Sequence, residues 1–241
     1  MRLSTSSKIG RKIDVIGFDA CLMSMLETAY AFRHLVSFLV SSEELEPGAG
    51  WDYVPIIRSL VSQPKMSSAQ LAKLIVAAYK DRYGDYHNTT MSITDLNKVD
   101  AIADSVSRLG DTLTSLAMHQ RPLIENSRSK LASFGADRGV PTSIDLATLT
   151  VQLSRDIADP DTAHAARDVQ DALKQAILLQ YASSVAAQKT GATGMAIYFP
   201  SSINDFNKDR YHTGYLKNNA DHPLDFVHDT HWPDFLASYL K

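Results

Sequence analysis

Cys21 is the only cysteine in the 241-residue chain, so no internal disulfide can form. A lone cysteine is either a small buried apolar side chain or a reactive thiol. Residues 12–18, KIDVIGF, have the pattern of a buried strand, and residues 22–33 have apolar side chains at helical spacing. We therefore expect Cys21 at the carboxyl end of a strand and in the first turn of a helix. Free N–H groups there favour a thiolate, and the N–H of Cys21 itself is placed to stabilise an oxyanion.

Acidic side chains gather in a segment that the pattern places near Cys21. Residues 43–53, EELEPGAGWDY, contain three glutamates, a proline and two glycines without periodicity, which predicts a loop. The loop follows a second predicted strand at residues 36–41, so strand, helix and strand form a βαβ unit with parallel strands. We expect the loop to leave the sheet at the same edge as Cys21. From composition alone, Glu43, Glu44 and Glu46 fit a solvated loop or a cation site such as calcium.

A histidine-containing tail is the other place where the sequence suggests a ligand. His228 and His231 are three residues apart and have His222, Asp225 and Asp229 nearby, a set that could hold zinc. However, there is no H-E-x-x-H motif and no second cysteine, so we predict no metal site here and interpret these residues as caps and surface groups. A small-molecule or metal-binding domain built around this tail remains an alternative function.

The remaining elements must position these residues. Helices are expected at 53–62 and 68–83, a strand at 89–94, a mostly helical span at 97–185 and one more core strand at 193–200. Within the helical span, apolar residues recur at spacings of three and four, which indicates either an internal helix pair or a coiled coil for a partner. The seam consists of Val99, Ile102, Val106, Leu109, Leu113 and Leu116.

Charge and hydropathy exclude several classes of protein. The net charge is -3 and no basic stripe is present, which argues against nucleic-acid binding. No run of apolar residues is long enough for a membrane span. Residues 1–11 are polar and basic without an apolar core, so we expect no signal peptide in this chain.

Two N-terminal motifs carry a resemblance to a known family. Residues 16–23, IGFDACLM, followed by residues 42–53, SEELEPGAGWDY, resemble the clostripain family of cysteine peptidases, relatives of caspases, gingipains and legumains. Residues 194–200, GMAIYFP, and 232–239, WPDFLASY, are similar to that family as well. The resemblance covers the chain from residue 12 onward. It implies a partial caspase-like α/β fold: a mostly parallel sheet flanked by helices, with a large helical segment before the last core strand.

The resemblance also implies roles for individual residues. Cys21 would be the nucleophile, and Asp19 would line a specificity pocket for Arg or Lys. Family members often have an acidic residue at the position of Ala49. Either Glu44, Glu46 or Asp52 compensates for its absence, or the pocket is less selective. Trp51 belongs to the same substrate-binding motif. Calcium is possible as a cofactor, and export to the cell envelope or the extracellular space of a bacterium is implied.

The catalytic histidine implied by the resemblance precedes the nucleophile strand. Only twenty residues precede Cys21, and none of the eight histidines lies in that position. We therefore expect one partial catalytic domain, with an α/β core at 1–96, a helical segment at 97–190 and a last strand and tail at 191–241. The chain alone should be inactive or nearly so, and its partners would be a peptide or protein substrate and a histidine-bearing N-terminal part. The alternative is a non-catalytic caspase-like scaffold that binds protein partners.

Overall fold

A computed structural model describes residues 10–85, 87–136, 142–210, 212–218 and 224–241 of the chain. Residues 1–9, on which the expectation of no signal peptide rests, and His222 of the histidine-containing tail lie outside this part. Within the described residues, no helix is both long and apolar enough to cross a bilayer.

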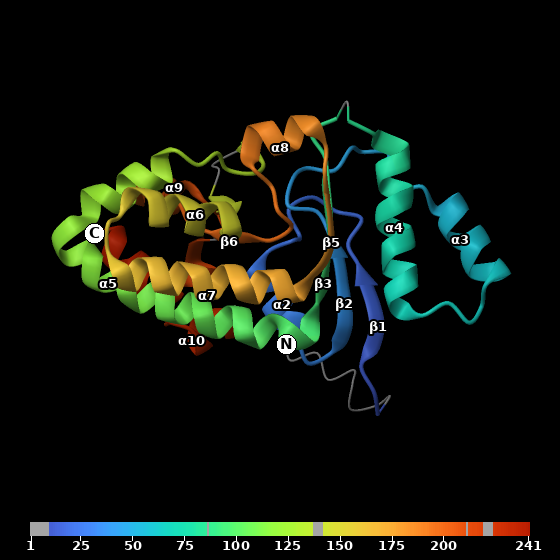
Figure 1. The fold of residues 1–241 in the computed structure, drawn as a ribbon, viewed down its shortest axis with the longest axis horizontal. Coiled ribbons are helices and arrows are strands. Elements are labelled where there is room, and N and C mark those ends of the chain that lie inside the picture. Colours follow the sequence, from blue (N-terminus) through green and yellow to red (C-terminus); the bar gives the residue numbers. More distant parts are fainter. Residues whose placement is uncertain (1–9, 86, 137–141, 211, 219–223) are drawn as a thin grey trace.

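The main sheet has four strands in the order β1–β2–β3–β5 (Figure 1). The strands are β1 (Ile13–Gly17), β2 (Val36–Ser41), β3 (Thr90–Asp95) and β5 (Ile177–Ala182). Strands β1 and β2 are parallel, with Val15 opposite Phe38, which confirms the predicted βαβ unit. The expectation of a mostly parallel sheet is wrong for the described residues, because β3 is antiparallel to both β2 and β5. Strand β3 enters the sheet through helices α3 and α4, which bring the chain back in the opposite direction.

Helices cover both faces of this sheet (Figure 1). On one face lies α4 (Ser68–Tyr83), with the shorter α3 (Tyr53–Ser62) beyond it. On the other face lie α2 (Leu26–Phe32), α5 (Val99–Ser129) and α7 (Pro160–Ala176). Successive residues of β2 face opposite cores, as expected for a strand: Leu39 packs with the α5 side and Val40 with the α4 side. The predicted α/β class, a sheet flanked by helices, is confirmed.

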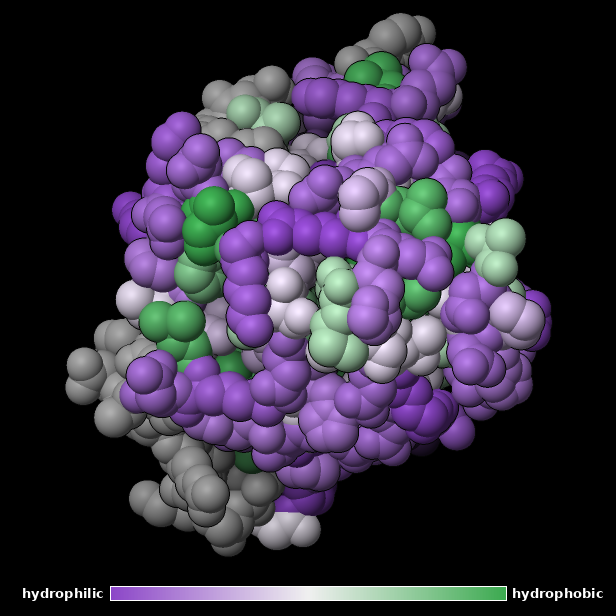
Figure 2. Space-filling model, turned by 90° about the vertical axis from the view of Figure 1, so that its left-hand side faces the viewer, coloured by the Kyte–Doolittle hydropathy of each residue, from purple (hydrophilic) through white to green (hydrophobic). Residues whose placement is uncertain are grey.

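The seam of the long helical span is internal. Val99, Ile102, Val106 and Leu109 are all buried, and α5 packs along both α7 and the C-terminal helix α11 (Trp232–Tyr239). The outer end of this helical layer presents a mainly hydrophilic surface with scattered apolar residues (Figure 2). The internal helix pair, rather than a coiled coil for a partner, is therefore the correct interpretation of the spacing.

Two short strands form a second sheet that the sequence pattern did not separate. Strand β4 (Ser143–Asp145) is antiparallel to β6 (Ala196–Tyr198), and Met25 forms a single bridge to Ala196. The predicted strand at 193–200 is thus buried in the core but lies outside the four-stranded sheet. The other elements of the described chain are α6 (Leu146–Asp156), α8 (Ser184–Thr190), α9 (Ile203–Lys208) and α10 (Asp225–Asp229), with short 3₁₀ turns η1 (Leu96–Lys98) and η3 (His212–Tyr215).

Candidate active site around Cys21

Cys21 lies in a turn after β1, and not in the first turn of a helix. The helix α2 begins only at Leu26, so the expected stabilisation of the thiolate by a helix N-terminus does not apply. The reason is that the chain after Cys21 is tied to the neighbouring loop. The N–H of Leu22 donates to the carbonyl of Glu44 at 3.3 Å, and that of Ser24 donates to Ser42 at 2.9 Å. These bonds keep the segment out of the helix.

Leu22 has a backbone conformation that few side chains adopt. Its φ is +60°, and it is the only non-glycine residue with a positive φ in the described part of the chain. For a bulky residue this conformation is strained and is found mostly at functional sites. The hydrogen bonds to the loop therefore stabilise this turn, although the backbone conformation of Leu22 within it is unfavourable.

The sulfur of Cys21 is half-exposed and has one N–H donor. The backbone N–H of Glu46 donates to Sγ at 3.2 Å, and the thiol approaches the carbonyl oxygen of the same residue at 3.8 Å. An N–H aimed at a sulfur stabilises negative charge on it. The N–H of Cys21 itself, unlike those of Leu22 and Ser24, donates to no acceptor among the described residues. It is available for an oxyanion, as the sequence suggested.

Asp19 lies two residues before the thiol and is exposed. Its Oδ2 accepts two hydrogen bonds, from the N–H of Trp51 at 3.1 Å and from the hydroxyl of Tyr53 at 2.9 Å. Gly50 makes this approach possible, because a Cβ there would lie 2.7 Å from the Asp19 carboxylate. Asp19 is thus a fixed anion beside the candidate nucleophile.

Glu46 lies behind Asp19 and is only 7% exposed. Its Oε2 accepts from the indole N–H of Trp51 at 3.0 Å. Burial, followed by repulsion from Asp19, raises the pKa of Glu46 to about 8, so its carboxyl is mostly protonated at neutral pH. The Trp51 ring lies against Gly17, where a Cβ would come within 2.6 Å of the ring. The sequence-predicted residues Asp19, Glu46 and Trp51 therefore form one cluster with Cys21.

Glu44 and Asp52, the other two predicted binding residues, have structural contacts instead. Glu44 is buried, and its Oε1 accepts from the N–H groups of Leu45 and Gly135, both at 2.9 Å. Asp52 caps α3 by accepting from the N–H of Val54 at 3.1 Å. The structure does not bring either carboxylate to Asp19.

Glu43, the remaining glutamate of the loop, is also buried. Its Oε2 accepts from the N–H of Gly194 at 2.7 Å. Burial, with repulsion from Asp145, raises the pKa of Glu43 well above its usual value. The solvated-loop interpretation is wrong for all three glutamates, because they bond backbone N–H groups and the Trp51 indole inside the protein.

An open cavity of about 960 Å³ adjoins Cys21. Its described lining combines apolar side chains with the charged side chains of Lys208, Asp209 and Arg210. Sequence reasoning did not connect Cys21 with the part of the lining from Phe134 onward, because those residues lie more than a hundred positions away in the chain. The described lining is Cys21, Leu22, Met23, Met25, Phe134, Gly135, Thr142, Ser143, Tyr198, Lys208, Asp209, Arg210, Tyr215 and Leu224.

Glu27 contacts two tyrosines that line the cavity. It is buried on α2 and accepts from the N–H of Tyr198 at 3.0 Å and from the hydroxyl of Tyr215. The two tyrosine rings stack with centroids 4.0 Å apart. Burial raises the pKa of Glu27, although both hydrogen bonds oppose the shift.

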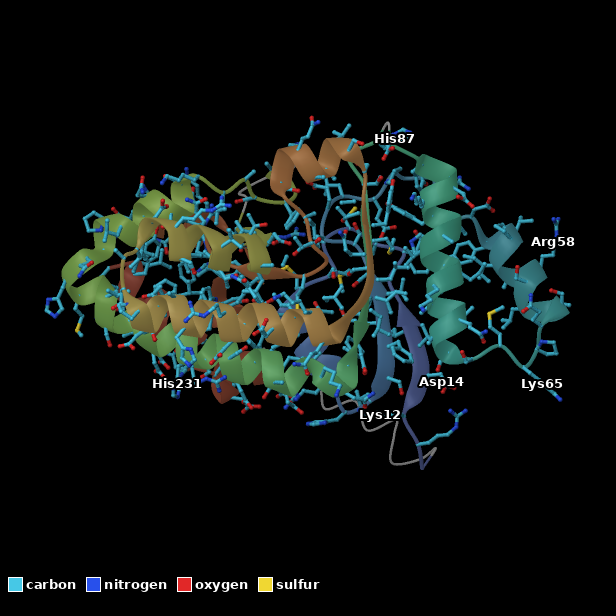
Figure 3. All side chains as sticks on the ribbon, in the orientation of Figure 1. Lys12, Asp14, Arg58, Lys65, His87 and His231 are labelled. Atoms are coloured by element: carbon cyan, nitrogen blue, oxygen red, sulfur yellow. The ribbon has the colours of Figure 1, made fainter. Side chains whose placement is uncertain are left out.

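None of the described cavity-lining residues is a histidine. His87 packs on the ring of Tyr83 beyond α4, and His231 lies at the start of α11, near the opposite end of the molecule (Figure 3). His231 pairs with Asp111 at 2.8 Å. Among the described residues, no imidazole therefore contacts the Cys21 thiol.

The carboxylates of Glu43, Glu44 and Glu46 are not arranged to bind a calcium ion. Two of the three loop carboxylates are committed to backbone N–H groups, and the third bonds the Trp51 indole and faces Asp19. Calcium needs six or more oxygen ligands that converge. No group of three or more acidic, histidine or cysteine side chains in the described residues could hold a metal, and this includes His228 and His231 with their neighbours.

A sheet between two helical layers, with a half-exposed thiol after a strand and a carboxylate beside it, defines a caspase-like α/β fold with a candidate cysteine nucleophile. Comparison with family models places the chain further. The model described as "Clostripain family" matches residues 2–239, so the chain belongs to the clostripain family of cysteine peptidases.

Solved structures support the fold. A cysteine protease from B. fragilis shares 18% identity at a TM-score of 0.62, over 93% of this chain and 91% of that one. A clostripain from Bacteroides thetaiotaomicron, in complex with a peptide inhibitor, shares 17% at 0.59, over 97% and 90%. A secreted C11 cysteine protease from the same organism, bound to an irreversible peptide inhibitor, shares 15% at 0.61, over 90% of this chain and 60% of that one. No curated protein matches the sequence.

Proposed function

We propose that this chain is the nucleophile-bearing part of a cysteine endopeptidase that cleaves after Arg or Lys. One observation carries the proposal: the half-exposed Cys21 thiol, with the Glu46 N–H on its sulfur, lies beside the fixed Asp19 carboxylate and at the mouth of a large cavity. The cavity gives room for a peptide, and the carboxylate gives a reason for a cationic side chain to bind.

In the proposed reaction, the Cys21 thiolate attacks the carbonyl carbon of the scissile peptide bond. The N–H of Cys21 stabilises the oxyanion that forms. The carbon–nitrogen bond then breaks, and the amine leaves with a proton from the catalytic histidine. Water hydrolyses the thioester and regenerates the thiol.

The histidine is proposed to come from an N-terminal part of the same protein. Two observations support this. No described residue that lines the cavity is a histidine, and the outer edge of β1 is paired to no other described strand. A histidine-bearing strand paired there would place its carboxyl end next to that of β1, and therefore next to Cys21. The secreted protease from B. thetaiotaomicron, of which this chain covers 60%, is long enough to contain such a part.

We also propose the extracellular space or cell envelope of a bacterium as the setting of this protein. One similar structure is that of a secreted protease, which supports this proposal. Its partners would be a peptide or protein substrate and the histidine-bearing part. The calcium suggested by the resemblance finds no suitable ligands in the described residues, and no step of the proposed reaction uses it.

The test is an assay of residues 1–241 alone and together with the histidine-bearing part, using fluorogenic peptides that end in Arg, Lys or Ala. We expect negligible turnover by the chain alone and robust, Cys21-dependent cleavage after Arg or Lys by the assembled protein. The Cys21→Ala variant is the control. Robust turnover by the chain alone contradicts the need for a second part, and inactivity of the assembly favours the non-catalytic scaffold.

A further inference from the structure

Glu46 is a second carboxyl group behind Asp19, and the reaction proposed above does not use its side chain. We infer that Glu46 determines specificity by releasing a proton when a guanidinium or ammonium group of the substrate binds at Asp19. The inference rests on the proposed function and assigns a role to a residue that the nucleophile itself does not need.

The geometry around Glu46 supports a site for a cation. Oε2 is bonded to the Trp51 indole, whereas Oε1 is enclosed and has no donor of good geometry among the described residues. The carboxyl of Asp19 and the backbone of Ala20 also interact with this carboxyl and affect its pKa. A buried acidic oxygen without a good donor is costly unless the group is neutral or a cation arrives.

The other charged or titratable groups that face Glu46 are acidic or neutral. Asp19 and Cys21 approach it from the turn after β1, Tyr53 from α3 and Tyr79 from α4. Tyr79 is fully buried, and its hydroxyl has no partner among the described residues. None of these groups supplies a positive charge to the pair of carboxyls.

A cation that contacts this loop is engaged elsewhere. Arg82 on α4 donates to the carbonyl of Ala49 at 3.5 Å, and its guanidinium lies over the ring of Tyr83. Neither carboxyl accepts a hydrogen bond from a lysine or arginine in the described part of the chain. The missing positive charge is therefore one that a substrate would bring.

The consequence is proton-linked binding. In the empty site the Glu46 carboxyl keeps its proton at neutral pH, because its pKa is about 8. A cation at Asp19 lowers the pKa of Glu46, because an opposite charge nearby favours the ionised form. The pair then carries one more negative charge with substrate bound than without. Affinity for a cation should rise with pH up to about 8 and then level off.

Calorimetric titration of the full chain with benzamidine, an amidinium probe, tests this directly. Titrations in phosphate and in Tris buffer count the protons exchanged on binding. For the wild type we expect release of close to one proton at pH 7, little release at pH 9, and about tenfold tighter binding at pH 9 than at pH 7.

Matched variants separate Glu46 from its neighbours. Glu46→Gln should bind benzamidine without proton release and with no rise in affinity over this range. Asp52→Asn removes a carboxylate of the same loop that only caps α3, and it should behave like the wild type. Asp19→Asn should lose most of the binding.

Failure of this inference can be told apart from failure of the proposed function. The inference is overturned if the wild type binds without releasing a proton, if Glu46→Gln keeps the pH dependence, or if benzamidine does not bind. The peptidase proposal is judged separately, by Cys21-dependent cleavage of Arg-ended peptides in the assembled protein.

Discussion

At the scale of single residues, the site depends on the close approach of the Cys21 thiol to Asp19 and Glu46. Glu46 approaches both, through its backbone N–H on the sulfur of Cys21 and its carboxyl near Asp19. Asp19 and Glu46 are separable by mutation, because one is exposed and the other is buried.

Replacing Asp19 should remove selectivity and spare the nucleophile. In Asp19→Asn the hydrogen-bond acceptor for Trp51 and Tyr53 is kept while the charge is lost. We expect the preference for Arg over Ala at the cleavage site to fall by roughly 30-fold or more in kcat/KM, since losing one member of a charge pair that the bound substrate covers costs about 2–5 kcal/mol. A parallel fall for both peptides would contradict this role for Asp19.

Sequence reasoning reached Cys21 from its local pattern, and the resemblance to the clostripain family pointed to Asp19, Glu46 and Trp51. Cys21 and Asp19 follow a strand with a clear pattern, and Glu46 and Trp51 follow the next strand. The cavity could not be predicted, because Phe134, Lys208 and Tyr215 reach Cys21 only through the tertiary fold. The burial of Glu43 and Glu44 could not be predicted either, because glutamate side chains are usually exposed to solvent.

At the scale of elements, the loop between β2 and α3 is the structure that builds the site. It accepts the N–H groups of the turn after β1, and glycines allow its close approach to Asp19. Gly50 has φ +62° and leaves no room for a Cβ. The backbone conformation of the loop therefore fixes the position of Asp19, the proposed specificity carboxylate.

Gly50→Ala should disturb both stability and specificity. A side chain at this φ is strained, and its Cβ would press on Asp19. We expect the free energy of unfolding to fall by about 1–3 kcal/mol in urea titrations, together with reduced discrimination between Arg-ended and Ala-ended peptides. As a control, Gly48→Ala adds a Cβ with no heavy atom within 4 Å, and it should change both quantities much less. Equal effects of the two substitutions would contradict the close approach.

Glu43 makes the same loop sensitive to pH. Its folded pKa is raised, so the folded state binds more protons than the unfolded state between the two pKa values, and stability falls as pH rises above about 4.5. Glu43→Gln mimics the protonated form. It should match the wild type near pH 4 and be increasingly more stable towards pH 8, by at most about 1.4 kcal/mol per pH unit. Thermal melts across this range provide the measurement, and a constant difference would refute the interpretation.

The elements themselves were predicted unevenly. Strands β1, β2 and β3 and helices α3 and α4 lie where the pattern placed them, because period, caps and breakers agreed. Strand β5 was missed, since ILLQYA continues the apolar spacing of α7 and its Leu178 and Leu179 stay partly exposed at the edge of the sheet. The start of α2 was also misplaced, because long-range hydrogen bonds from Leu22 and Ser24 outweigh local helical periodicity.

At the scale of the whole molecule, β1 forms one edge of the main sheet in the described residues. It pairs only with β2, and Ile13 is 40% exposed. A long unpaired strand edge promotes association between copies. The same edge is where the proposed histidine-bearing part would add its strand.

We therefore expect the chain to associate in a concentration-dependent way when it is alone. Light scattering should show oligomers that give way to a single species when the histidine-bearing part is present. Ile13→Lys should reduce the association, because a charge at an edge opposes pairing. Ile203→Lys, at a residue of similar exposure on α9, should not. A monodisperse monomer of the wild type at high concentration would count against the proposed edge.

The most direct test of the central claim is labelling of the assembled protein with a peptidyl chloromethyl ketone that ends in Arg, followed by intact-mass measurement. A thiolate at Cys21 beside a site for a cation predicts a single adduct on Cys21. The adduct should be absent in Cys21→Ala and should form much more slowly in Asp19→Asn or with an Ala-ended reagent. An unmodified Cys21 after prolonged exposure, in a folded assembly, would contradict the assignment of this residue as a peptidase nucleophile.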